Sequence, residues 1–211
     1  MPSKNHSNSR PYQILYEHDG IIVVNKDVGI PTQPTKNKSK TSQIQSLYEL
    51  LLERFSYVGL HHRLDQSTSG LLIFTTEKCN NRSIAQQIQK KEISRHYTSV
   101  VLGKPTEYTG KWTTPVDGKQ ATTIWTCIKS NGLSSILELQ LHTGRKHQIR
   151  VQAHTHNFPI LGDRRYGAAG NLAKRLCLHA HRLSFVHPKS QKRIDIYSPI
   201  PNSMQVYMNN I

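Results

Sequence analysis

Residues 61–74 read HHRLDQSTSGLLIF, the chemically richest stretch of this 211-residue chain. Two histidines, an arginine, an aspartate and three hydroxyl side chains come directly before an apolar run. A loop at the end of a buried strand is a common place for reactive side chains. Arg63 and His62 precede Asp65 closely, and neighbouring cations favour an ionised carboxylate that can act as a base or a nucleophile. The residues alone leave a second interpretation open, an Asx-type turn in which Asp65 accepts backbone hydrogen bonds near Ser67 or Thr68.

Short strands surround this stretch. GLLIFTTE (70–77) predicts a buried strand, and YQILYE (12–17) and IIVVNK (21–26) predict two more, joined by a turn at His18-Asp19-Gly20. Between them and residue 61, Ser42 and Gln45 form a capping-box pattern. Ile44, Leu47, Leu51 and Phe55 then repeat at helical spacing, which predicts an amphipathic helix of about three turns.

The second half of the chain repeats this mixture. Residues 80–92 predict a helix and 93–103 a β-branched strand, while 104–118, with two prolines and two glycines, predict a long connection. Asn131-Gly132 joins the alternating runs 121–130 and 133–142, the strongest short hairpin signal. A helix over 146–155 and strands over 176–188 and 192–200 complete the pattern.

Strands outnumber helices, and the regular alternation of a doubly wound parallel fold is absent. We therefore predict one α/β (α+β) domain over residues 11–211, built on a mixed, largely antiparallel sheet flanked by helices. Residues 1–10 predict a disordered basic arm. No linker rich in Pro, Gly or Ser divides the chain into two units.

The charge balance indicates the partner. Lys and Arg number 28 against 13 Asp and Glu, which gives a formal net charge of +15 and an isoelectric point near 9.9. Nucleic acid is the commonest partner of so basic a chain, because each neutralised phosphate releases counterions. No apolar run approaches the ~20 residues of a membrane span. Three scattered cysteines predict reduced thiols and a cytoplasmic protein without a disulfide framework.

A second cluster of charged residues spans LHTGRKHQIR (141–150) and PILGDRRYG (159–167). Its guanidinium and ammonium groups can bind phosphate or pair with a buried carboxylate. The plainer alternative is the solvated surface of a basic helix. Lys36, Lys38 and Lys40 lie on a Pro- and Thr-rich loop, and they are either phosphate contacts or a solvated lysine run.

HRLDQSTSGLLIF closely resembles the HRLDxxTSGLLLF signature of the RluA-type pseudouridine synthase family. Further blocks are similar to that family and stand in the family's order. They are ILYEHDGIIVVNKDVGI (14–30), RHYTSVVLG (95–103), LHTGRKHQIR, PILGDRRYG and LCLHAHRLSFVHP (176–188). The resemblance covers nearly the whole chain and implies an RNA pseudouridine synthase without a separate S4 domain. It also implies the pseudouridine synthase fold and the isomerisation of uridine to pseudouridine in transfer or ribosomal RNA, with base flipping.

The resemblance further implies roles residue by residue. Asp65 matches the essential aspartate, Tyr97 the tyrosine that stacks on the target uracil, and Arg150 the arginine that pairs with the carboxylate. Arg63 matches a residue that helps to displace the flipped base. Leu72 or Ile73 is assigned to the apolar floor. A final group is expected to contact RNA: His62, Arg145, Lys146, Lys36 and Lys38.

Isomerisation needs no group donor and no redox step, so we expect no cofactor, no metal and no obligatory protein partner. Three departures from the family pattern bear on the choice of substrate. Asp27 stands where Pro is usual, Thr32-Gln33-Pro34 replaces Val-His-Pro, and Gln152 occupies a place often held by His.

The sequence leaves two rival functions. One rival is a metal-dependent nuclease, suggested by the pairs His154/His156 and His179/His181. No cluster of acidic residues and no zinc-type Cys-His spacing accompanies these pairs in the sequence. The other rival is a non-catalytic RNA-binding module of the same fold. The presence of Asp65, Tyr97 and Arg150 together argues against it.

Overall fold

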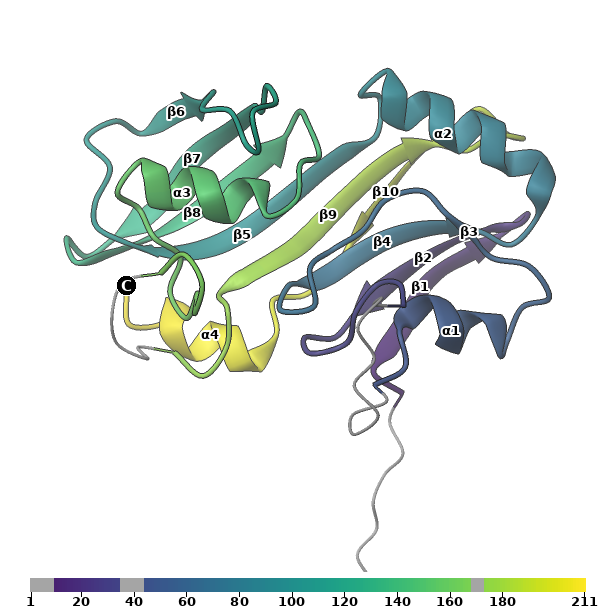
Figure 1. The fold of residues 1–211 in the computed structure, drawn as a ribbon, viewed down its shortest axis with the longest axis horizontal. Coiled ribbons are helices and arrows are strands. Elements are labelled where there is room, and N and C mark those ends of the chain that lie inside the picture. The colour runs from purple at the N-terminus through teal and green to yellow at the C-terminus, as the bar shows by residue number, and fades with distance from the viewer. Residues whose placement is uncertain (1–9, 35–43, 168–172) are drawn as a thin grey trace, which may run out of the picture.

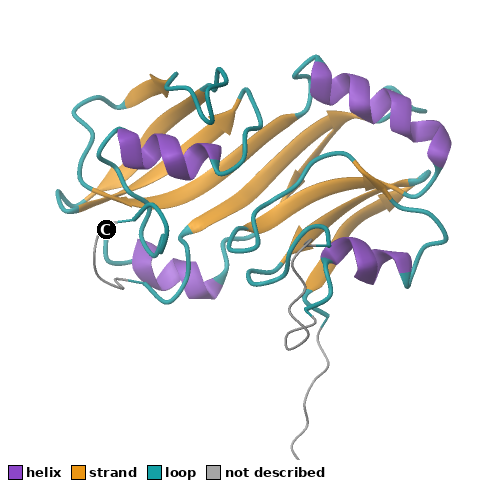
Figure 2. Cartoon of the chain, viewed as in Figure 1, coloured by secondary structure: helices purple, strands orange, loops and turns teal. Residues whose placement is uncertain are grey.

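The computed structural model describes residues 10–34, 44–167 and 173–211. These residues form one ten-stranded sheet with helices packed against it (Figures 1 and 2). The strand order is β1-β2-β4-β9-β5-β8-β7-β6, with β10 beside β9 and β3 beside β4. The strands are β1 Tyr12–His18, β2 Ile21–Lys26, β3 Gly59–Leu60, β4 Ser69–Thr75, β5 Ser94–Leu102, β6 Thr109–Trp112, β7 Thr123–Ser130, β8 Ser134–Leu141, β9 Leu178–Val186 and β10 Arg193–Tyr197. The helices are α1 Leu47–Leu52, η1 Lys78–Asn80, α2 Asn81–Gln89, α3 Gln148–Thr155 and α4 Asn202–Met208.

The predicted mixed, largely antiparallel sheet is confirmed. Among the strand pairs of the described residues, β4 and β9 run parallel and the others are antiparallel. The Asn131-Gly132 hairpin joins β7 and β8 as predicted. The Asn131 side-chain oxygen accepts the backbone N–H groups of Leu133 and Ser134 at 3.0 and 2.9 Å, which closes the turn.

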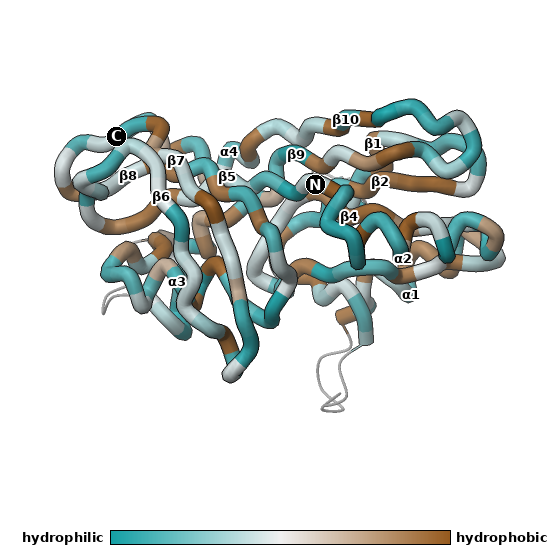
Figure 3. Tube along the Cα trace, turned by 90° about the horizontal axis from the view of Figure 1, so that it is seen from above, coloured by the Kyte–Doolittle hydropathy of each residue, from teal (hydrophilic) through white to brown (hydrophobic). Residues whose placement is uncertain are grey.

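Two apolar clusters lie on opposite faces of the central strands. Alternate residues of β2 and β4 supply them, with Ile22 and Val24 in the larger cluster and Ile21 and Val23 in the smaller. Helices α1, α3 and α4 pack on the larger cluster and α2 on the smaller. All seven residues of β4 are buried, so the strand is covered on both faces. Long hydrophobic stretches are visible along the strands near β2 and β4 in Figure 3.

Gly70 fixes where the 61–74 loop meets the sheet. Its φ is +118°, and a Cβ there would lie 2.3 Å from the carbonyl oxygen of Ala180 on β9. Only glycine allows this close approach of the two parallel strands, because any side chain would collide with backbone. The loop before β4 is therefore anchored at the middle of the sheet, where β4 meets β9.

Two local predictions are wrong, a third lies outside the described residues, and two short elements were not predicted. The helix near residue 50 is six residues long rather than about three turns, because Ser46 caps its start and Glu53 ends it. Its capping box joins Ser46 and Glu49; the predicted box at Ser42 lies outside the described residues. The 104–118 connection contains β6, since Trp112 buries its ring against Trp125. Strand β3 and helix α4 were not predicted.

Three smaller observations bear on the predicted class of protein. Within the described ranges, no helix is long and apolar enough to cross a bilayer. The three cysteines, Cys79, Cys127 and Cys177, are free thiols. The predicted basic arm falls almost wholly in residues 1–9, outside the described part of the chain.

Candidate active site

The loop carrying Asp65 is clamped from both sides. The Thr32 hydroxyl accepts the backbone N–H of Leu64 at 3.1 Å and donates to the Leu64 carbonyl at 2.8 Å. On the other side of Asp65, the N–H of Gly29 donates to the Gln66 carbonyl at 2.8 Å. Thr32 belongs to a departure from the family pattern, and its buried hydroxyl holds the loop rather than facing solvent.

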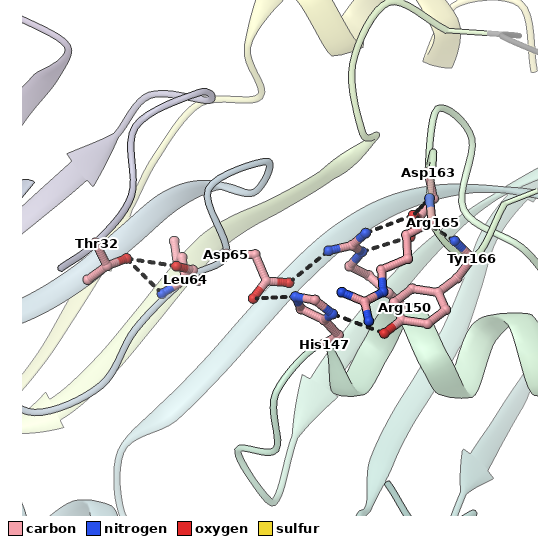
Figure 4. A network of polar contacts seen from close by, with 8 residues as sticks. All are labelled: Thr32, Leu64, Asp65, His147, Arg150, Asp163, Arg165 and Tyr166. Carbon is pink, nitrogen blue, oxygen red and sulfur yellow. Dashed lines mark hydrogen bonds and ion pairs between the residues drawn. The ribbon is translucent and has the colours of Figure 1, made fainter. Parts of the chain in front are cut away.

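The Asp65 side chain faces cationic and imidazole groups of α3 (Figure 4). Its Oδ2 accepts a hydrogen bond from Arg150 Nη1 at 3.2 Å, and its Oδ1 lies 3.6 Å from His147 Nε2. The turn here is closed by the backbone, because the Thr68 N–H donates to the Asp65 carbonyl at 3.0 Å. The alternative Asx turn is therefore wrong, and the carboxylate is directed at Arg150, as predicted.

Arg150 is held in place by a second aspartate, Asp163. The Arg150 Nε and Nη2 donate to the two carboxylate oxygens of Asp163 at 2.7 and 2.8 Å. Asp163 also accepts the backbone N–H groups of Arg165 and Tyr166 at 3.0 and 3.1 Å. Burial raises the pKa of Asp163, but these hydrogen bonds outweigh it and hold the pKa below its ordinary value. The Arg150 guanidinium also lies over the Tyr166 ring at 5.2 Å.

His147 stands at the start of α3 with a left-handed backbone, φ 57°. Burial, together with Arg150, Arg165 and Lys146, lowers its pKa against the opposing effect of Asp65. Its Nδ1 lies 3.1 Å from the Tyr166 hydroxyl. A neutral ring that accepts the Tyr166 O–H at Nδ1 carries its proton on Nε2 and presents it to Asp65. The strained backbone thus aims one donor at the carboxylate.

A cavity of about 550 Å³, the first cavity, opens beside Asp65. Tyr97 on β5 lines it and is only 4% exposed. Burial raises the pKa of Tyr97, so the phenol stays neutral and its ring is an apolar face beside the carboxylate. The apolar part of the wall includes Leu64, Ile149 and Leu178. The assignment of Leu72 or Ile73 to the floor is wrong, because both side chains are fully buried on opposite faces of β4 and neither lines the first cavity.

His62 lines the first cavity, but it is not the cation expected beside Asp65. Its Nε2 accepts the backbone N–H of Ile73 on β4 at 3.1 Å. Burial, with Arg95 and His61, lowers its pKa to about 3. The imidazole is therefore neutral, and Arg150 is the positive group that contacts the carboxylate.

The remaining predicted RNA contacts divide into two groups. Arg63, Arg145 and Lys146 are exposed and line the mouth of the first cavity. Arg145 also donates from Nε to the Gln120 carbonyl at 3.1 Å. Lys36 and Lys38, with Lys40, lie outside the described residues.

The other two departures have structural explanations. The backbone N–H of Asp27 donates to the Pro11 carbonyl at 3.1 Å, a bond that proline could not form. Gln152 is fully buried. Its side chain accepts the Thr123 hydroxyl at 2.7 Å and donates to the Thr114 carbonyl at 2.9 Å. Gln152 therefore shapes the connection around β6 and does not face the first cavity.

The histidine pairs do not form a metal site. No group of three His, Cys, Asp or Glu side chains suited to a metal ion occurs among residues 10–34, 44–167 and 173–211. His179 is fully buried between the hydroxyls of Ser69 and Ser198, at 2.8 and 3.2 Å. His154 is exposed on α3.

Sequence reasoning missed two residues of the site. His147 and Asp163 stood only as letters in the basic stretches LHTGRKHQIR and PILGDRRYG, without a role of their own. The signal for Asp163 was present, because an aspartate beside Gly162 and before two arginines is a candidate buried carboxylate for Arg150. Gly162 itself has φ +76°, and a Cβ there would lie 1.9 Å from the Arg175 carbonyl oxygen. This turn needs glycine to bring Asp163 to α3.

Comparisons with known proteins show which family the chain matches. A family profile described as RNA pseudouridylate synthase matches residues 20–155. Among curated relatives, an "Uncharacterized RNA pseudouridine synthase YhcT" of Bacillus subtilis is 32% identical over 91% of this chain. A "Ribosomal large subunit pseudouridine synthase D" of Neisseria meningitidis is 31% identical over 90%. The chain spans 70% and 59% of the lengths of these two relatives.

Solved structures show the same fold. "Human RNA Pseudouridylate Synthase Domain Containing 4" superposes with a TM-score of 0.73 at 20% identity, covering 93% of this chain and 91% of that one. "Human RNA Pseudouridylate Synthase Domain Containing 1" gives 0.72 at 22% identity, covering 89% and 83%.

Proposed function

This chain belongs to the RNA pseudouridylate synthases, isomerases that convert uridine in RNA to pseudouridine, and from that premise we propose that Asp65 carries the reaction on a base flipped into the first cavity. The substrate is a specific uridine in a structured RNA, either a transfer RNA or a ribosomal RNA stem-loop. The single observation that supports this most is the contact of Asp65 with Arg150 in the wall of the cavity that Tyr97 lines.

The cavity suits a flipped pyrimidine. Taking a base out of its stack costs a few kcal/mol, and stacking on an aromatic ring returns about 1–3 kcal/mol. The buried, neutral ring of Tyr97 offers that face. Arg63, exposed at the mouth, is placed to contact the strand that the base leaves. Hydrophobic walls hold the detached uracil away from water while it turns.

Asp65 must remain charged when the nucleoside displaces water from it. Arg150 supplies the compensating positive charge and is itself fixed by two bonds to Asp163, so it does not need to reorganise during the reaction. The carboxylate can then act on the nucleoside as nucleophile or base. The reaction moves uracil within one nucleotide, so it requires neither a redox group nor a donor.

The basic groups at the mouth support RNA as the substrate. Arg63, Arg145 and Lys146 surround the opening and add to a chain charge of +15. We include Lys36 and Lys38 as further phosphate contacts. Specificity in RNA comes mainly from loop shape and from bases that can be splayed out, which favours a stem-loop. Free thiols are compatible with the cytoplasmic location that we propose.

The test is pseudouridine mapping of total RNA from cells with and without the gene. We expect at least one uridine site to lose its modification in the deletion strain. Complementation with the wild-type gene restores that site, whereas Asp65→Asn, expressed at the same level, does not. Unchanged maps in the deletion strain, or full restoration by Asp65→Asn, would refute the proposal.

A further inference from the structure

A second cavity lies on the other side of the Asp65 loop and has a different lining. It measures about 570 Å³ and shares Asp65, His147 and Arg150 with the first cavity, so these three side chains stand between the two spaces. The loop from Val28 and the turn around Gly162 form the rest of its wall. An occupant of this cavity therefore adjoins the Asp65 carboxylate.

The lining of the second cavity is strongly basic. Five guanidinium or ammonium groups face it against the two carboxylates of Asp65 and Asp163, a net charge of +3 with His147 neutral. Arg150 already satisfies both carboxylates. Arg175 donates to the hydroxyls of Ser69 and Ser203, at 2.7 and 3.3 Å.

Three cations of this cavity remain available. Arg164, Arg165 and Lys174 are exposed, and within the part of the chain that the structure describes their side chains make no hydrogen bond or ion pair. The Arg165 guanidinium is steadied over the Tyr166 ring at 5.3 Å. The chemistry of such a group of free cations around a hollow suits an anion.

The chemistry of the lining points to phosphate rather than to a base. A base-binding pocket usually offers an aromatic ring for stacking. Among the described residues, the only ring lining this cavity is the imidazole of His147, which is engaged with Asp65 and Tyr166. Guanidinium groups match phosphate oxygens in pairs. The position next to Asp65 limits the phosphate to those that adjoin the reacting nucleotide.

We propose that the second cavity binds the RNA backbone phosphates adjoining the target uridine, through Arg164, Arg165 and Lys174. This rests on the proposed function, because it takes the first cavity as the place of the flipped base. The site then holds the substrate at two points on either side of Asp65. The phosphate contacts fix the register of the strand, and the first cavity accepts the base.

The probe is a fluorescent decamer of uridylate, whose dissociation constant is measured by anisotropy between about 50 and 200 mM salt, the range over which phosphate contacts are most visible. The test variant carries Arg164→Ala, Arg165→Ala and Lys174→Ala. Its matched control also loses two arginines and one lysine, by Arg82→Ala, Lys129→Ala and Arg193→Ala, which are exposed positions that line neither cavity.

Each lost phosphate contact lowers the salt slope on single strands by about 0.7. The salt slope of the test variant should therefore be about 2 smaller than that of the wild type. Across this salt range the affinity of the wild type should fall about 20-fold more than the affinity of the test variant. The single variant Arg164→Ala should lose about 0.7. The wild type should bind a decamer with uncharged methylphosphonates at its central linkages more weakly than the unmodified decamer. The test variant should bind the two decamers equally.

The two proposals fail separately. Asp65→Asn should keep the wild-type salt slope and form no pseudouridine, so normal turnover by that variant overturns the function assigned to Asp65. If Asp65→Asn is inactive but the test variant and its control have the same slope, the phosphate site alone is refuted. An equal loss of affinity for the methylphosphonate decamer in wild type and test variant would refute it as well.

Discussion

Replacing Asp163 with asparagine should destabilise the protein far more than the same change at Asp65, although both carboxylates contact Arg150. Asp163 is 1% exposed at its side chain and accepts two charge-assisted bonds from Arg150, at 2.7 and 2.8 Å. Removing one partner of such a buried pair costs about 3–5 kcal/mol. Asp65 is 19% exposed and accepts one bond at 3.2 Å, so its loss should cost about 1 kcal/mol or less.

Urea unfolding monitored by circular dichroism measures this difference. The urea m-value should stay constant because the fold is unchanged. In thermal unfolding of a chain of 211 residues, a loss of about 3–5 kcal/mol in the free energy of unfolding lowers the melting temperature by roughly 6–20 °C. Equal losses for Asp163→Asn and Asp65→Asn would refute the division into an anchoring and a reacting aspartate. So would an Asp163→Asn variant that is as stable as the wild type.

Three further predictions concern stacking, pH and the turn before Asp163. Tyr97→Phe should keep most of the activity on RNA. Tyr97→Leu should lower the activity at least about tenfold, because about 1–3 kcal/mol of stacking disappears. Equal activities of the two variants would contradict the stacking role. His179 is neutral in the folded protein, with a pKa lowered to about 3 by burial and by Arg175, while the unfolded chain binds its proton near 6.5. His179 alone should therefore lower the stability as pH drops below about 6.5, by about 2–3 kcal/mol at about pH 4.5. His179→Asn should remove that part of the pH dependence in urea titrations, and an unchanged slope contradicts the assignment. Gly162→Ala should lower the free energy of unfolding clearly more than Gly118→Ala. Gly118 has a similar positive φ but open space around it, so its replacement should cost only about 1–2 kcal/mol. Equal melting temperatures of the two variants would contradict the packing argument.

The sequence predicted the elements whose local signals agree with their packing. The Asn131-Gly132 hairpin, the buried strand after Gly70 and the helix ending at Thr155 are all present. It failed where a distant contact decides the outcome. Strand β6 lies in a segment rich in proline and glycine, and it forms because it pairs with β7 and buries Trp112.

The site could be predicted only as far as its motif residues. The contact between Asp65 and Arg150 joins residues 85 apart in sequence and was foreseen through the family resemblance. His147 and Asp163 were not assigned, because their roles depend on the left-handed entry to α3 and on the turn at Gly162. His147 stands within a run of cations in the sequence, whereas burial and the neighbouring cations lower its pKa and keep the ring neutral.

The most direct test of the role of Asp65 uses purified wild-type protein and the Asp65→Asn variant with the RNA that loses its modification in the deletion strain. Pseudouridine is quantified per molecule of bound RNA after a single turnover, with binding measured in the same samples. If Asp65 carries the reaction, both proteins bind the RNA equally, the wild type converts the uridine fully, and Asp65→Asn forms no detectable product. Product formation by the variant at the wild-type rate would contradict this role of Asp65.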